Sequence, residues 1–195
     1  VVRHESIDRL FHWLMAASIL VLIFTGVAPI LGLRVAWLDI HWISGLLLTF
    51  LVVAHIIRAS FWQDFKSMLL MPKDFAEPFD SSRKPGKYYF EQKGMHWAVT
   101  VVALAVIVTG VLMFMQIDSP FWDRTNSMAE DQLGLVFLLH GLSTLALVAL
   151  AATHIYFALR PEKIFYTRSM ISGWMSEDEM AANHDTSKWS PKEAE

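Results

Sequence analysis

The chain has 195 residues, a formal net charge of −3 and no cysteine, and 54 % of its residues are hydrophobic. Without cysteine it can neither hold an iron–sulfur cluster through thiolates nor attach a c-type haem covalently, and it can form no disulfide. The mildly acidic balance also leaves no basic footprint of the kind that nucleic-acid-binding proteins carry.

Four apolar runs, at 10–33, 40–57, 95–117 and 133–159, contain no Asp, Glu, Lys or Arg. Each can cross a hydrocarbon layer about 30 Å thick as a helix, although the run at 40–57 must recruit its flanks. The opening residues resemble neither a basic leader nor a cleavage site, so we expect the first run to be a membrane span. The sequence therefore predicts an all-α integral membrane four-helix bundle over residues 1–175, in contact with lipid, with a polar tail at 176–195. This leaves no room for a separate catalytic domain.

The distribution of basic residues predicts the orientation of these spans. Arg34 and Arg124 lie in the connections after the first and third runs, whereas the other fourteen Lys and Arg residues lie before the first run, between the second and third, or after the fourth. Because basic residues gather on the cytoplasmic side of a membrane, we expect both termini and the long loop 60–94 to be cytoplasmic. The membrane is then the cytoplasmic (inner) membrane of a bacterium or archaeon.

The chain also repeats itself as a pair of helices. His12-Trp13 and Thr25-Gly26 recur at the same separation as His96-Trp97 and Thr109-Gly110, and the spacing from His41 to His55 recurs from His140 to His154. This pattern predicts a parallel two-helix pseudo-repeat. Fourteen helical residues return a side chain to nearly the same face about 21 Å further along. Helices that offer imidazoles at two depths can hold two stacked haems, and without cysteine these are non-covalent, b-type haems.

The predicted topology assigns these histidines to two levels. The outer level contains His41 and His140 and has no competing histidine. The inner level has four candidates for two ligand positions: His12, His55, His96 and His154. Repeat symmetry alone favours His55 with His154, so the partner of His154 stays open at this point.

Several motifs taken together carry a family resemblance. They are Ile7-Asp8-Arg9 followed by His12-Trp13, His41 with Gly45, Gly86-Lys87-Tyr88 leading to Gln92-Lys93, and His140 with His154. In this order the chain resembles the cytochrome b (gamma) subunit of membrane-bound respiratory formate dehydrogenase and related quinone-reactive diheme cytochromes b. The resemblance implies an outer haem held by His41 and His140 and an inner haem held by His12 and His154. His55 then becomes an alternative inner ligand or a quinone contact.

The resemblance also implies a quinone pocket beside the inner haem, framed by the end of the long loop. In this chain Tyr89 stands where the family has Asn, so we expect Tyr89 and Gln92 to contact the quinone. Haem propionates need cationic partners near the inner face, and the candidates are Arg9, Arg58 and Arg160.

The implied function is electron transfer in a respiratory chain. Electrons from an iron–sulfur subunit on the outer side would cross two b-type haems to a quinone, menaquinone or ubiquinone, on the cytoplasmic side, while a molybdenum or tungsten catalytic subunit oxidises the substrate. Two alternatives remain. A free-standing diheme cytochrome b could pass electrons from a small donor to quinone, and a histidine-lined metal transporter is disfavoured because none of the apolar runs contains a carboxylate.

Overall fold

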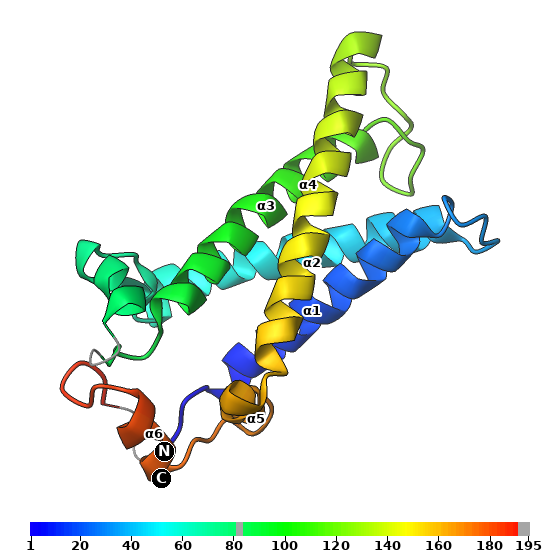
Figure 1. Ribbon diagram of the computed structural model, residues 1–195. Coiled ribbons are helices and arrows are strands. Elements are labelled where there is room, and N and C mark those ends of the chain that lie inside the picture. The colour runs from blue at the N-terminus through cyan, green and yellow to red at the C-terminus, as the bar shows by residue number, and fades with distance from the viewer. Residues whose placement is uncertain (81–83, 191–195) are drawn as a thin grey trace. The chain divides into compact units, whose positions relative to one another are not determined.

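The computed structural model describes residues 1–80 and 84–190. Arg83 and Lys192, which belong to the count of basic residues, and the end of the predicted tail lie outside the described residues. Four long helices account for most of the chain: α1 (Ser6–Val27), α2 (Trp37–Trp62), α3 (Phe90–Phe114) and α4 (Glu130–Ala158) (Figure 1). Each is long and apolar enough to cross a membrane, which confirms the four predicted spans.

The helix boundaries differ from the apolar runs for local reasons. Helix α1 ends at Val27. Pro29 follows and has no backbone N–H to continue the helix. Gly32 then ends the turn in a left-handed conformation, with a φ of +68°. Helix α3 begins at Phe90, where polar side chains accept the free backbone N–H groups of its first turn. Glu77 Oε2 accepts from Phe90 N at 3.1 Å, and Gln92 Oε1 accepts from Tyr89 N at 3.1 Å.

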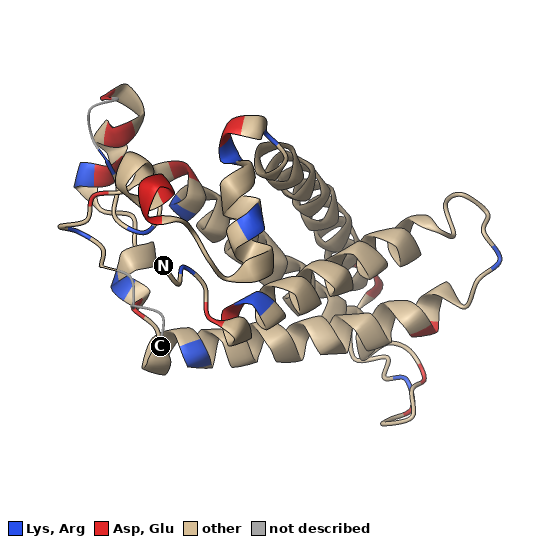
Figure 2. Cartoon of the chain, turned by 90° about the horizontal axis from the view of Figure 1, so that it is seen from below, with Lys and Arg blue, Asp and Glu red and all other residues tan. Residues whose placement is uncertain are grey.

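The long helices expose large apolar side chains, as expected for lipid-facing spans. Leu20, Phe50, Val101 and Leu145 are each at least half exposed, with fractions of 55 %, 67 %, 64 % and 68 %. Figure 2 shows the complementary charge pattern, because Lys, Arg, Asp and Glu gather near helix ends and in the connecting segments. Such apolar surfaces would be unfavourable in water and are satisfied in a bilayer.

The chain divides into two compact units. Unit 1 comprises residues 1–13, 54–97 and 152–195, and unit 2 comprises residues 14–53 and 98–151. Arg34 and Arg124 are the basic residues of unit 2, and the other described Lys and Arg residues belong to unit 1.

The long loop of unit 1 is ordered by two short 3-10 helices, η1 (Phe65–Met68) and η2 (Pro72–Phe79). Asp74 and Lys93 form an ion pair of 2.8 Å, and their residues are only 2 % and 8 % exposed. The indole N–H of Trp97 donates to Met68 O at 2.9 Å. These contacts fix the loop against the start of α3.

The segment after α4 is built into unit 1. It comprises η3 (Pro161–Lys163), α5 (Ile164–Ser172) and α6 (Glu177–Asn183), and Val2 forms an antiparallel bridge with Trp174. The capping box of Ser176 and Glu179 starts α6 in the usual way. The sequence predicts a polar tail from residue 176, but in the structure Lys84 and Tyr89 of the long loop donate to carbonyls of α6, and His184 and Trp189 pack against Arg3 of the N-terminal segment.

Arg3 and His184 join the two ends of the chain in this unit. Arg3 Nη1 donates to His184 Nε2 at 2.9 Å, and His184 Nδ1 in turn donates to Gly86 O at 2.7 Å. The Arg3 guanidinium also lies over the rings of Tyr166 and Trp189, at 4.6 and 5.4 Å from their centroids. Burial of the imidazole, which is 2 % exposed, lowers the pKa of His184 to about 4 and so keeps the ring neutral at physiological pH.

Candidate functional site

Unit 2 brings together the two histidines predicted for the outer level. His41 of α2 and His140 of α4 face each other with ring centroids 6.3 Å apart and ring planes at 72°. They belong to segments about a hundred residues apart in the chain, so the pairing depends on how the helices pack.

Two threonines orient these imidazoles. Thr25 Oγ1 donates to Val21 O at 2.8 Å and lies 2.8 Å from His41 Nδ1, while Thr109 Oγ1 donates to Ala105 O at 2.6 Å and lies 2.9 Å from His140 Nδ1. Because each hydroxyl proton is already used within its own helix, the threonine oxygen accepts from Nδ1–H. Both imidazoles therefore carry their proton on Nδ1 and keep the lone pair of Nε2 for a metal.

The glycine after each threonine leaves room for the ring. A Cβ at Gly26 would lie 3.7 Å from His41 Cε1, and a Cβ at Gly110 would lie 3.3 Å from His140 Cε1. A Cβ at Gly110 would crowd the imidazole of His140, whereas a Cβ at Gly26 would make an ordinary van der Waals contact with that of His41. The repeated Thr-Gly pairs of α1 and α3 thus form two matching clamps for the histidines of α2 and α4.

Unit 1 brings together the pair that the family resemblance favours for the inner level. The rings of His12 in α1 and His154 in α4 are 6.2 Å apart with planes at 54°. Trp13 packs edge-on against His12 at 5.1 Å, and its indole N–H donates to Met170 O at 3.2 Å. His12 Nδ1 is buried and has no hydrogen-bond partner among the described residues, in contrast to the threonine-bound histidines of unit 2.

His55 has different neighbours within the same unit. Its ring lies 6.3 Å from Phe11 of α1 and 6.3 Å from His96 of α3. The structure therefore places His55 opposite His96, while His12 is the histidine opposite His154.

The separations of these rings fit axial ligation of one metal ion by two imidazoles. A metal–imidazole bond measures about 2 Å and the ring centroid lies about 1 Å behind the nitrogen, so two axial imidazoles have centroids about 6 Å apart. The pairs His41–His140 and His12–His154 match this value, and so does His55–His96, so the family resemblance and not the distance favours the first two pairs. The Nδ1–H protonation of the unit 2 pair leaves Nε2 of both imidazoles available to a haem iron.

The predicted quinone contacts in the loop already have protein partners. The hydroxyl of Tyr89 donates to Asn183 O at 2.9 Å, and Gln92 caps α3 through the Tyr89 N–H. Burial raises the pKa of Tyr89, which keeps its phenol protonated. These side chains hold the loop to the C-terminal segment.

The three arginines predicted near the propionates differ in how their charge is balanced. The Arg58 guanidinium pairs with Asp8 at 2.9 Å and Glu5 at 3.2 Å, and Arg160 pairs with Glu162 at 3.3 Å. Arg9 donates to the carbonyl of Ile171 and, at 3.0 Å, to the hydroxyl of Ser6, which are uncharged groups.

Comparison with known proteins agrees with this arrangement. Residues 3–173 match the family described as prokaryotic cytochrome b561. The chain belongs to this family. The cytochrome is also 26 % identical, over 194 aligned positions that cover 90 % of this chain and 77 % of the relative, to a Haemophilus influenzae protein named formate dehydrogenase, cytochrome b556 subunit.

Membership in this family makes the protein a multi-pass membrane cytochrome b that takes part in electron transfer and binds b-type haem. It confirms the resemblance inferred from the sequence motifs. The ring separations of His41–His140 and His12–His154 are those that two imidazole ligands of one haem would need.

Sequence reasoning missed two participants in these clusters. Thr25 and Thr109 were visible only as a repeated Thr-Gly pair, whereas His96 was one of the four inner-level candidates. The signal for the threonines was their identical distance, in both repeats, from the preceding His-Trp pair.

Proposed function

We propose that the protein is the diheme membrane subunit of a respiratory oxidoreductase, which carries electrons across the membrane to a quinone. The observation that carries this proposal is the presence of two histidine pairs, 6.3 and 6.2 Å apart, in a chain with four membrane-spanning helices. Bound between these pairs, two b-type haems would supply one-electron transfer between a donor and the quinone.

The residues of the chain would divide the work between the two units. His41 and His140 would hold one haem, with Thr25 and Thr109 fixing their Nδ1–H protonation. His12 and His154, the latter fourteen residues after His140 on α4, would hold the other. We infer that the first haem lies toward the outer side, because the unit that would hold it has two basic residues and the rest of the chain has fourteen.

Among the arginines, Arg9 is the best partner for a propionate of the inner haem. It lies one turn before His12 on α1 and its charge is balanced by no carboxylate in the contacts above. Arg58 and Arg160 are already neutralised by acidic partners, so a propionate would add less to their electrostatic balance.

The relative named formate dehydrogenase, cytochrome b556 subunit supports a place in a complex of this kind. We propose an iron–sulfur subunit as the electron donor and a molybdenum or tungsten subunit as the site of substrate oxidation, in the cytoplasmic membrane. The lack of cysteine supports this division, because the chain cannot hold an iron–sulfur cluster itself.

A haem assay tests the proposal directly. The purified protein should give two haems per chain in a pyridine haemochrome assay, and His140→Ala should remove one spectral component while His12→Ala removes the other. Gentle detergent extraction should also retain an iron–sulfur partner. One haem per chain, or the loss of the inner component from His55→Ala but not from His12→Ala, would contradict the assignment.

A further inference from the structure

One pair of intramembrane histidines has no part in the haem assignment above. His55 of α2 and His96 of α3 lie within unit 1 with ring centroids 6.3 Å apart and planes at 68°. An ionisable side chain within a span is costly and usually marks an ion or proton path. Imidazole is also the side chain whose ordinary pKa suits proton exchange near neutrality.

A charged cluster of unit 1 lies next to this pair. Arg58 lies three residues after His55 on α2, which is about one helical turn and the same side of the helix. Asp8 pairs with Arg58 at 2.9 Å and accepts a hydrogen bond from Gln63 Nε2 at 2.6 Å. The side chains of Asp8 and Arg58 are only 20 % and 17 % exposed, so this part of the cluster is partly shielded from water.

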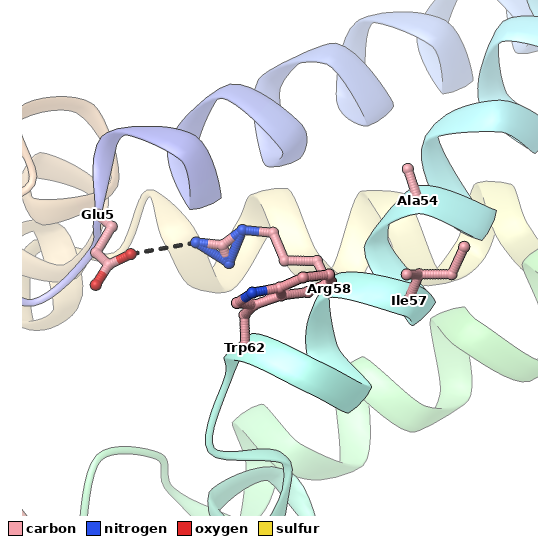
Figure 3. Close-up of a pocket in the computed structure, with 5 residues that line it drawn as sticks. All are labelled: Glu5, Ala54, Ile57, Arg58 and Trp62. Carbon is pink, nitrogen blue, oxygen red and sulfur yellow. Dashed lines mark hydrogen bonds and ion pairs between the residues drawn. The ribbon is translucent and has the colours of Figure 1, made fainter.

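The cluster opens to the surface through a hollow. Glu5, Ala54, Ile57, Arg58 and Trp62 line a cavity of about 510 Å³. In Figure 3 the Arg58 guanidinium reaches toward Glu5, to which it is bonded at 3.2 Å, and the Glu5 side chain is 49 % exposed. Arg58 thus connects two carboxylates, the exposed one of Glu5 at the rim of the hollow and the more shielded one of Asp8.

We propose that His55 and His96 form a proton-transfer pair that delivers protons to a quinone bound beside them, and that the Glu5–Arg58–Asp8 cluster refills the pair from water. The inference rests on the proposed quinone reduction. A quinone becomes a quinol by taking up two electrons, which bound haems would supply, and two protons. Each proton leaves an imidazolium N–H as that bond breaks, and a new O–H bond forms on a quinone oxygen. Two histidines match the two protons.

The other side chains near the loop are less suited to this task. The Tyr89 hydroxyl already donates to the carbonyl of Asn183, and its pKa is raised by burial, so it yields a proton poorly. Gln92 has no ionisable proton, and its side-chain oxygen accepts from the Tyr89 N–H. The charged groups of the cluster are Arg58, one turn after His55 on α2, and its ion-pair partner Asp8 of α1.

The test uses the purified cytochrome with its haems bound and reduced. His55→Gln and His96→Gln keep a hydrogen-bonding side chain but cannot exchange a proton at neutral pH. Ser60→Ala is the matched control, because Ser60 is exposed on α2 and donates only to Ile56 O of its own helix. Stopped-flow spectroscopy then follows haem oxidation by menadione, which needs protons, and by ferricyanide, which accepts electrons alone.

Both histidine variants should retain two haems and unchanged oxidation by ferricyanide, while oxidation by menadione slows by about tenfold or more and gains a larger solvent isotope effect in deuterated water. The control variant should match the wild type. Equal menadione rates in the variants and the wild type would overturn the inference alone, as would loss of a haem from His55→Gln. If the wild-type haems react with ferricyanide and not with menadione, the quinone function itself fails, and the inference fails with it.

Discussion

Replacing Thr25 or Thr109 by valine tests whether the two threonines tune the haem of unit 2. Valine has nearly the shape of threonine and removes only the hydroxyl that accepts from histidine Nδ1. A hydrogen bond at Nδ1–H makes an imidazole more basic and a better donor to the metal, which stabilises the oxidised iron. Loss of the bond should therefore raise the midpoint potential of this haem.

The size of the shift follows from the bond that is lost. The separations of 2.8 and 2.9 Å are those of ordinary neutral hydrogen bonds, which contribute about 1 kcal/mol each. For a one-electron couple a tenfold change in the equilibrium constant, about 1.4 kcal/mol, corresponds to about 59 mV. If most of the free energy of each hydrogen bond stabilises the oxidised haem, each single variant should raise the midpoint potential by about 40 mV and the double variant should raise it by about 80 mV.

Optical redox titration of the two haems provides the measurement. Thr49→Val is the matched control, because the Thr49 hydroxyl donates to Gly45 O of its own helix at 2.8 Å. The haem of unit 1 should keep its potential in all variants. A double variant whose potential moves by less than about 10 mV, or moves downward, would refute the reasoning.

Three further predictions concern stability and space. Docking of the C-terminal segment should weaken by about 3 kcal/mol in all as pH falls from 6.5, the ordinary histidine pKa, to about 4, the pKa of His184 in the folded protein, because the undocked segment binds the proton more readily. Thr186→Cys introduces a single cysteine into this cysteine-free chain. A fluorophore attached to it should report release of the segment between pH 6.5 and 4 and not above pH 6.5. Asp74→Asn should lower the thermal midpoint sharply, by an amount equivalent to about 3–5 kcal/mol, because the buried Lys93 ammonium loses its carboxylate; an unchanged midpoint would contradict this. Gly110→Leu should remove the unit 2 haem from the visible spectrum, since even a Cβ there lies 3.3 Å from the imidazole of His140. A variant with full haem content would contradict this prediction, because it would show that the helices move to accommodate the larger side chain.

Much of the fold could be predicted because each span satisfies its backbone hydrogen bonds internally and only needs an apolar exterior. The four runs without charge correspond to α1–α4, and errors were confined to the ends, such as the early stop before Pro29. The tail was less predictable. Its composition is polar, and nothing local in the sequence indicates that His184 would be buried against Arg3, a residue 181 positions away.

The sequence by itself determined that this chain is a membrane cytochrome, because apolar length, repeated histidines at fourteen-residue spacing and ordered motifs are properties of local sequence. Only the tertiary structure decided which histidines face each other, since an imidazole on one helix gains a partner through packing and not through spacing. It set His12 opposite His154 and His55 opposite His96, whereas repeat symmetry had offered His55 for His154. This departure from repeat symmetry arises because α1 brings His12 to His154 in unit 1. Two helices with matching sequences can therefore contact different neighbours.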